Sequence, residues 1–424
     1  MYSIITLVAE KVASFGRIAQ LGEHLPYKQR VTGSSPVAPT INPHSDGMRV
    51  FKLQKQEVKI MKKMRNSSLE LLKLISMLLI VISHATPDGN TEKFFGAIDI
   101  NLAYQNLQFF VTTLFHNLGQ IGNSIFIACS AYFLLDSTKT NAKKLLYIIG
   151  DCFAISVLMF VPFWIFSGYN FSAFYTVKQF FPVTFGNNWF IPCYLMFYAI
   201  HPFLNTVIEK MEKKTHLTFN LMFILMYCVL NFSFSGLFFY NRFLGFIGIY
   251  FIMAYIKKYL PETSASLKVN LWVMIGSIFG WIMLMFLTNI SGANIMSRWN
   301  SLINPFFIAI GLSAFNIAKS HTFYNRFINY ISGLTLYIYL IHCNRVIRDC
   351  VRFTIFGAIR IYFGYDNLVL WILLYSVVCF VASTVLAIIY NTFLRKPINK
   401  IFEKLGDLVS VLYGKLANQI LKLK

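Results

Sequence analysis

Charged side chains are scarce in this sequence. Asp, Glu, Lys and Arg together make up 13% of its 424 residues, whereas an ordinary soluble protein has about 25%. Hydrophobic residues make up 56% of the chain, and aromatic residues alone make up 17%. A chain with so few charges cannot keep a polar surface around so much apolar material. The composition therefore excludes an ordinary soluble enzyme and predicts a membrane protein that crosses the bilayer many times.

Acidic residues are the rarer of the two charged kinds. There are 17 Asp and Glu residues and 38 Lys and Arg residues, for a formal net charge of +21. Such an excess of positive charge is also typical of nucleic-acid-binding proteins. Here the basic residues lie in short segments between long apolar runs, as they do in the loops of membrane proteins. We therefore expect membrane lipids, and not nucleic acid, around this chain.

The sequence also lacks the common motifs of hydrolases and metal enzymes. It has no GxSxG nucleophile elbow, no HExxH zinc motif and no CxxC pair. Its seven cysteines lie mostly within apolar runs, where a free thiol packs as a small hydrophobic residue. We expect no metal cofactor, and the only disulfide that the sequence suggests is Cys343 with Cys350.

Hydrophobic runs long enough to cross a bilayer recur from Arg65 onward. They predict an all-α membrane bundle of about ten transmembrane helices. Apolar residues at helical spacing among five lysines near the end of the chain predict a C-terminal amphipathic helix on the membrane surface. The predicted spans are roughly 69–86, 117–135, 144–167, 188–208, 217–234, 242–260, 269–289, 301–318, 330–348 and 367–394.

Three parts of the chain follow from this pattern. Residues 64–395 form the membrane domain, and residues 396–424 form the basic amphipathic tail. Residues 1–60 are expected to be a disordered leader or the result of a start site assigned too early. The second interpretation comes from residues 16–40, which resemble the translation of a tRNA gene; the start would then be Met48, Met61 or Met64.

Lysine and arginine predict the orientation of the spans. Every second loop is rich in these residues, from Lys62 before the first span to Arg395 after the last. Because basic loops stay on the cytoplasmic side, this alternation predicts a plasma-membrane protein with both termini in the cytoplasm. The loop between the ninth and tenth spans breaks the pattern, since it holds Arg345, Arg348, Arg352 and Arg360. These arginines either bind an anionic ligand or face a wet cavity, or they form an interfacial helix that pairs with Asp349 and lipid headgroups.

Polar residues form a stripe on the first predicted span. Glu70 and Lys73 are an i, i+3 pair, and His84 follows eleven positions after Lys73, which brings it back to within roughly 20° on a helix. Ionisable groups at this depth normally face a protein interior or a wet cavity. The alternative is a core helix whose charges reach out to the two membrane surfaces. We therefore treat His84, Glu70 and Lys73 as candidate functional residues.

Two further groups of polar residues follow from the predicted topology. Lys143 and Lys144 lie at the cytoplasmic foot of the third span, on the same side of the membrane as Glu70 and Lys73. His342 leaves the ninth span at a depth similar to that of His84, either as a second proton-handling group or as a structural helix-end histidine. His116 and His201 are expected to be structural. The polar residues that this topology places toward the outer side include Asn188, Trp189, Arg242, Arg298, His342 and Arg345.

The first predicted span resembles the opening helix of acyltransferase family 3, a family of integral membrane O-acyltransferases. The motif in that helix runs from an acid through an arginine to a histidine, and Glu70, Lys73 and His84 match its positions. Lysine in place of arginine keeps the charge but loses the bidentate fork. Residues 123–135, 187–205 and 332–347 resemble later helices of the family, and the last of these ends in a Tyr-Leu-Ile-His motif at His342. The resemblance spans about residues 64–395, but the family's Arg-x-x-Arg element after its second helix is missing.

The resemblance implies transfer of an acyl group, usually acetyl, from cytosolic acyl-CoA to a hydroxyl of an envelope glycan or lipid-linked sugar. A neutral histidine suits such chemistry, because the acceptor hydroxyl must lose a proton. On this resemblance we predict that His84 is the catalytic base or a transient acyl carrier, and that Glu70 and Lys73 tune its field or line the donor's path. Lys143 and Lys144 would then bind the acyl-CoA donor, and the acceptor would be bound by Asn188, Trp189, Arg242, Arg298, His342 and Arg345. Two alternatives are a transporter or flippase of a lipid-linked sugar, which the lack of paired hydropathy repeats disfavours, and a catalytically degenerate scaffold.

Overall fold

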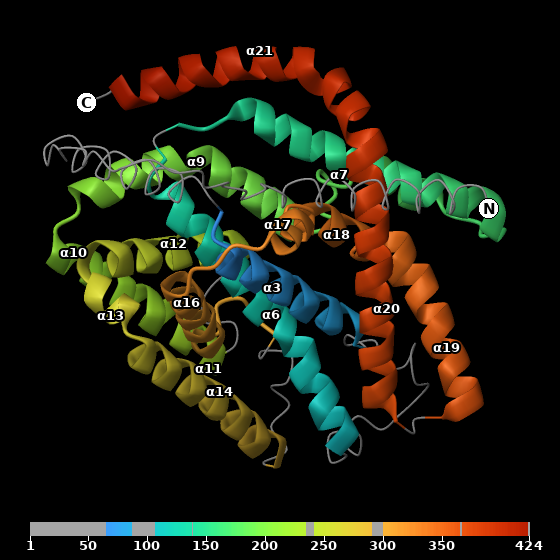
Figure 1. Ribbon diagram of the computed structural model, residues 1–424, viewed down its shortest axis with the longest axis horizontal. Coiled ribbons are helices and arrows are strands. Elements are labelled where there is room, and N and C mark those ends of the chain that lie inside the picture. Colours follow the sequence, from blue (N-terminus) through green and yellow to red (C-terminus); the bar gives the residue numbers. More distant parts are fainter. Residues whose placement is uncertain are drawn as a thin grey trace, which may run out of the picture. The chain divides into compact units, whose positions relative to one another are not determined.

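The computed structural model describes residues 65–86, 107–137, 139–234, 241–290, 300–364 and 367–422. The predicted leader, residues 1–60, lies outside the described residues. In the described part every regular element is helical (Figure 1), in agreement with the all-α prediction. The helices of the first half are α3 (Ser67–Ala85), α6 (Leu107–Leu134), α7 (Ala142–Ser167), α8 (Ala173–Phe180), α9 (Phe190–Lys210), α10 (Lys213–Met222), η1 (Phe223–Leu230) and α11 (Asn231–Ser233).

The second half of the domain continues in the same way. Its π-helical segments η2 and η3 join longer α-helices without an intervening loop. The elements are α12 (Arg242–Tyr259), α13 (Pro261–Ala265), α14 (Leu267–Ile290), α16 (Pro305–Ser320), α17 (Arg326–Ser332), α18 (Thr335–His342), η2 (Ile347–Val351), α19 (Arg352–Phe363), α20 (Leu368–Ile389), η3 (Tyr390–Leu394) and α21 (Arg395–Lys422).

The number of membrane spans differs from the predicted value of about ten. Among the described residues, six helical stretches are long and apolar enough to cross a bilayer, so the count of ten is not confirmed. The predicted span 301–318 corresponds to the shorter α16, and the predicted span 330–348 is divided between α17 and α18. The six stretches are Ser67–Ala85, Ala142–Ser167, Phe190–Lys210, Lys213–Ser233, Leu267–Thr288 and Leu368–Lys415.

Helix α6 shows why a predicted span can fall outside this set. It carries a row of polar side chains, including Asn117, Gln120, Asn123 and Ser124, all of which are buried. These groups lower the helix's hydropathy. Two of them are hydrogen-bonded inside the protein: Gln120 Nε2 donates to Asn300 Oδ1 at 2.9 Å, and Asn123 Nδ2 donates to Gln120 Oε1 at 3.3 Å. A polar face turned inward is the usual arrangement of such residues in membrane proteins.

Helices α3 and α6 pack closely against one another. Asn66 caps the start of α3 by accepting a hydrogen bond from the Ser68 amide at 3.0 Å. In α6, a Cβ at Gly122 would lie 2.6 Å from the Ser76 carbonyl oxygen, so only glycine allows this approach. The Ser76 hydroxyl donates to the Gly122 carbonyl at 2.7 Å. Small residues at such crossings let helix backbones come close in membrane proteins.

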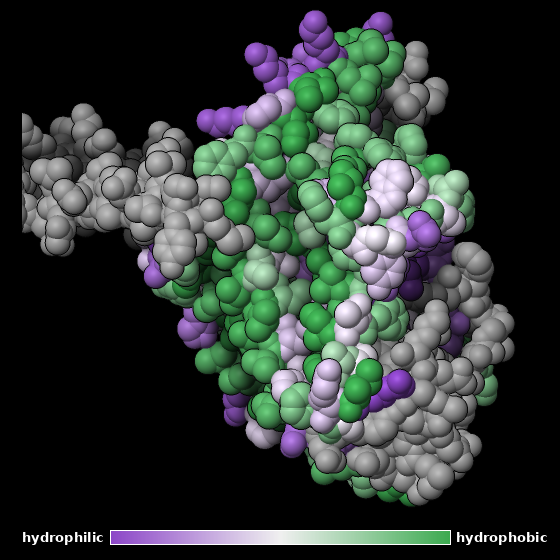
Figure 2. All heavy atoms as spheres, turned by 90° about the vertical axis from the view of Figure 1, so that its right-hand side faces the viewer, coloured by the Kyte–Doolittle hydropathy of each residue, from purple (hydrophilic) through white to green (hydrophobic). Residues whose placement is uncertain are grey.

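The C-terminal helix α21 continues directly from α20 through η3. Phe402 of α21 packs on Gly150 of α7, while Ile401 and Leu405 are exposed. The placement of this segment on the membrane surface stays a prediction. Exposed apolar side chains are also dense on α20, and Figure 2 shows a broad hydrophobic face with hydrophilic side chains gathered toward its margins. Such a face is what a bilayer would cover.

Candidate active site

A cavity of about 320 Å³ lies where several helices of the domain end. Its walls come from the end of α3, the middle of α6, the segment before α9, the start of α12, the end of α18, η2 with α19, and α20. Helix ends are common places for ligand sites because their polar groups are not all used within the helix.

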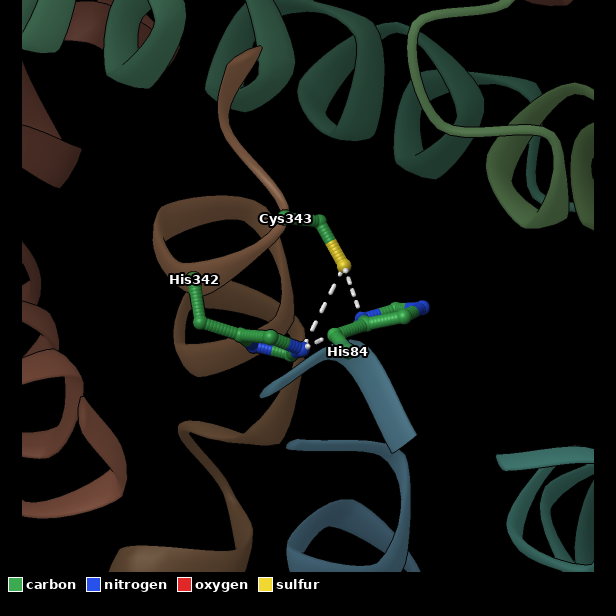
Figure 3. A group of neighbouring side chains, drawn as sticks. All are labelled: His84, His342 and Cys343. Atoms are coloured by element: carbon green, nitrogen blue, oxygen red, sulfur yellow. Dashed lines mark hydrogen bonds between the residues drawn. The ribbon is translucent and has the colours of Figure 1, made fainter. Parts of the chain in front are cut away.

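Two histidines and a cysteine form the centre of this cavity. His84 is at the end of α3, His342 is the last residue of α18, and Cys343 follows it. His84 Nδ1 lies 3.2 Å from His342 Nε2, and Cys343 Sγ lies 3.3 Å from each of these nitrogens. Figure 3 shows the three side chains converging on one point. We call this group the His-His-Cys triad.

The hydrogen bonds of the triad assign the histidine tautomers. His342 Nδ1 lies 2.8 Å from the Ile338 carbonyl oxygen, which only accepts, so this nitrogen carries a proton and donates it. In neutral His342 the other nitrogen, Nε2, then accepts; His84 Nδ1 at 3.2 Å and the Cys343 thiol at 3.3 Å are the two donors in reach. When His84 Nδ1 is the donor, the lone pair of His84 is on Nε2, which points away from His342 and Cys343 in Figure 3. His84 is thus presented as a proton acceptor on the wall of the cavity.

Arg352 fixes the end of helix α3 and, with it, His84. The Arg352 side chain is buried, and its Nη1 donates to the His84 carbonyl oxygen and, at 3.3 Å, to that of Thr86. Both carbonyls lie at the C-terminal end of α3, where no later residue of the helix donates a hydrogen bond to them. A guanidinium is a strong donor for them, since hydrogen bonds from a charged group are roughly twice as strong as neutral ones.

Arginine dominates the charge of the cavity. Among the described residues that line it are four arginines and no Asp or Glu: Arg242, Arg345, Arg348 and Arg352. Arg348 pairs with Asp349 at 2.8 Å, and the Arg242 guanidinium lies 4.8 Å from the centre of the Trp189 ring. Arg345 Nε is buried and has no hydrogen-bond partner among the described residues. The cavity is therefore suited to an anionic ligand.

The opposite wall of the cavity is polar and neutral. His116, Gln120 and Asn123 of α6 line it together with Asn300. Asn300 Nδ2 is in hydrogen-bond contact with His116 Nε2, and Thr86 Oγ1 lies 3.1 Å from His116 Nδ1. The expectation that His116 is structural is thus incomplete, because its side chain lies at the cavity. His201 fits its structural role: it is buried, and its Nδ1 lies 2.7 Å from the Tyr198 carbonyl oxygen.

The structure brings most of the predicted acceptor-binding residues together. Asn188 reaches the triad, because its amide nitrogen, when turned toward the backbone, donates to the Cys343 carbonyl at 3.1 Å. Arg298 lies outside the described residues. The predicted residues that line the cavity are His84, Asn188, Trp189, Arg242, His342 and Arg345.

Glu70 and Lys73 lie elsewhere. The structure places them near the start of α3, where Glu70 is about 21 Å and Lys73 about 17 Å along the helix from His84. They do not line the cavity. Glu70 accepts from Lys73 Nζ at 2.8 Å and from Arg65 at 3.4 Å. Between these groups and His84, Ser76 is fully buried and donates to the Gly122 carbonyl. A path for the donor along this stripe stays a prediction.

Lys143 and Lys144 also lie outside the cavity lining. Lys143 forms an ion pair with Asp407 of α21 at 2.5 Å, and Lys144 lies 5.0 Å from the centre of the Tyr198 ring. Their role in donor binding stays a prediction.

Sequence reasoning missed several residues of the site. Cys343 was considered only for a disulfide with Cys350, but both thiols are free. Gln120 and Asn123 gave no signal beyond their position in an apolar run. The loop between the ninth and tenth predicted spans did carry a signal. Its Arg345, Arg348 and Arg352 are spaced as i, i+3 and i+7, which places them on one helical face.

Comparison with protein families matches residues 66–390 to the acyltransferase domain of acyltransferase family 3. Searches of curated proteins and of solved structures found no match. The family match covers most of the chain, including every helix that contributes to the cavity. The chain therefore belongs to acyltransferase family 3 and is a membrane acyltransferase.

Proposed function

We propose that this protein transfers an acyl group, with acetyl favoured, from acyl-CoA to a hydroxyl of an envelope glycan or lipid-linked sugar. The observation that carries the proposal is the chain of contacts from the Ile338 carbonyl through His342 to His84 Nδ1. With Nδ1 of His84 as the donor in this chain, its Nε2 has the lone pair that accepts a proton. O-acyl transfer requires a base at the acceptor hydroxyl, and an oriented neutral imidazole is the usual choice.

In the proposed reaction His84 Nε2 takes the proton of the acceptor hydroxyl as the oxygen attacks the thioester carbonyl. The new C–O bond forms, the C–S bond breaks, and the proton leaves His84 for the departing CoA thiolate. While His84 is protonated, His342 Nε2 accepts from its Nδ1, which stabilises the imidazolium. His342 is thus a positioning residue, and this route needs no acyl-histidine intermediate.

The arginines of the cavity provide the second element of the proposal. Arg345, with its buried unpartnered Nε, would bind a phosphate or carboxylate of the substrates. Such an anion could come from the CoA donor or from the acceptor sugar; competition of each substrate with free CoA and with an uncharged acceptor analogue separates these sources. The Arg242 guanidinium lies over the Trp189 ring, so the two side chains hold one another in place at the cavity wall, where hydroxyls of an acceptor could accept from the guanidinium.

The test is acyl transfer by purified wild type and His84→Ala, followed as the loss of acyl-CoA in the presence of envelope polysaccharide. We expect His84→Ala to lose about 10²-fold or more of the transfer rate, with an unchanged size-exclusion profile. His321→Ala is the matched control, since His321 is exposed at the end of α16. Turnover by His84→Ala within a few-fold of wild type would exclude His84 as the base.

A further inference from the structure

The His-His-Cys triad has the geometry of a metal site. Its ligand atoms form a nearly equilateral triangle, with His84 Nδ1 to His342 Nε2 at 3.2 Å and both nitrogens at 3.3 Å from Cys343 Sγ. Around tetrahedral Zn²⁺, bond lengths of about 2.0–2.1 Å to nitrogen and 2.3 Å to sulfur give separations of about 3.3 Å between two nitrogens and about 3.6 Å between nitrogen and sulfur. The triangle thus needs a change of only a few tenths of an ångström.

Hydrogen bonding alone does not account for all three contacts. His342 Nε2 has no proton, because the proton of the neutral ring is on Nδ1 and is donated to Ile338. His84 and Cys343 supply at most one proton each to the triangle, so three edges share two protons. A cation at the centre would instead bind one lone pair from each of the three atoms, His84 Nδ1, His342 Nε2 and Cys343 Sγ.

The surroundings hold the three donors in place. The Ile338 carbonyl fixes the His342 ring through Nδ1 at 2.8 Å, the kind of outer contact that metal-binding histidines usually make. Cys343 is the C-cap of α18, and its amide donates to the Tyr339 carbonyl at 3.0 Å. Arg352 holds the backbone of His84. Since the triad lines the cavity, a fourth position is open to water.

We propose that the His-His-Cys triad is a Zn²⁺ site. Two imidazoles and a thiolate select zinc over Mg²⁺ or Ca²⁺, which prefer oxygen ligands. The Cys343 thiol must lose its proton to bind. The thiolate offsets only one of the two metal charges, and the guanidiniums of Arg348 and Arg352 oppose the rest, so the site is suited to reversible binding and not to a permanent structural ion.

Zinc bound to the His-His-Cys triad would block acyl transfer at this site. This part of the inference rests on the proposed function of His84 as the base. Zinc takes the lone pair of His84 Nδ1, so the single proton of the neutral ring moves to Nε2. The protonated Nε2 cannot accept a proton from the acceptor hydroxyl. Zinc is therefore an inhibitor here, in keeping with the expectation that the reaction uses no metal cofactor.

The first test measures binding directly. Purified full-length protein, stripped with EDTA, is equilibrated with Zn²⁺ or Co²⁺ and desalted, and bound metal is measured by mass spectrometry. We expect one metal per wild-type chain and a sulfur-to-cobalt charge-transfer band in the Co²⁺ form. Cys343→Ser should lose this band and most of the metal, whereas Cys193→Ser, a change in a thiol of α9 outside the triad, should keep both. Wild type without the band, or with the band retained in Cys343→Ser, would overturn the metal site.

The second test separates the site from the proposed function. Zn²⁺ should suppress acyl transfer by the wild type at the concentration that fills the site, and EDTA should restore it. Binding with sulfur ligation but without loss of transfer would contradict His84 as the base while the metal site stands. If the wild type binds no zinc, the metal site is wrong, and transfer by His84→Ala still tests the base on its own.

Discussion

His342 is the residue whose replacement tests the site most sharply. In His342→Leu a side chain of similar size keeps α18 packed, but it removes the acceptor that His84 Nδ1 faces at 3.2 Å. In His342→Gln the side-chain oxygen is as many bonds from the backbone as Nε2 and can still accept. If His342 only filled space, both variants would behave alike. If it orients His84, glutamine should rescue part of the activity.

The expected size of the effect follows from the lost hydrogen bond. A buried donor left without a partner costs about 1–3 kcal/mol, and about 1.4 kcal/mol corresponds to a tenfold change in rate. We therefore expect kcat to fall by roughly 10- to 100-fold in His342→Leu, with a change in KM of less than about threefold, because the loss acts on the transition state more than on substrate binding.

The assay follows CoA thiol release in the presence of acceptor, with thermal unfolding in detergent as the control for folding. His342→Gln should keep kcat within about tenfold of the wild-type value. Equal rates for His342→Leu and wild type, or equal losses in the leucine and glutamine variants at equal stability, would refute the role of His342 in orienting His84.

Three further changes test other parts of the structure. Gly122→Leu places side-chain atoms where a Cβ already lies 2.6 Å from the Ser76 carbonyl, so unfolding in detergent should be easier by about 1–3 kcal/mol or more; Gly276→Ala, with nothing within 4 Å, is the control and should unfold as wild type or slightly later. Arg345→Gln should raise the KM of the anionic substrate by about tenfold and weaken its dependence on salt, whereas a neutral substrate analogue should be unaffected; equal KM values would remove Arg345 from the anion site. Lys143→Ala should leave stability almost unchanged, because its partner Asp407 is mostly exposed. It should raise the KM of acyl-CoA several-fold if the predicted donor contact is right; Lys139→Ala is the control, and an unchanged KM would show that prediction to be wrong.

Hydropathy predicted the helices better than it predicted the spans. A run of apolar residues is sufficient to identify α7, α9, α14 and α20, since each contains most of its predicted span. It could not show that the run through Ser332 and Gly333 is divided, because a break depends on where neighbouring helices leave room for one. Hydropathy also predicted a span within α6 from its apolar residues. The buried amide side chains along one side of this helix lower its mean hydropathy, and α6 is not among the six stretches that are apolar enough to cross a bilayer.

The site was predicted in part, and the reason lies in distance along the chain. His84 and His342 were identified from motifs at the ends of two helices, yet their contact joins residues 258 positions apart. Glu70 and Lys73 were grouped with His84 because helical spacing aligned them on one face. Spacing gives the angle around a helix, but it does not show that Ser76, between them along the helix, is fully buried.

The sequence by itself determined that this chain is an all-helical membrane protein, and it identified the two histidines, Asn188, Trp189, Arg242 and Arg345 as candidates. These conclusions depend on local properties, namely hydropathy, periodicity and short motifs, which a single chain carries without its fold. Only the tertiary structure placed Cys343 against both histidines, turned Arg352 onto the end of α3 and separated Glu70 from the cavity. Those outcomes depend on how helix ends from distant parts of the chain pack together, and no local pattern specifies that packing.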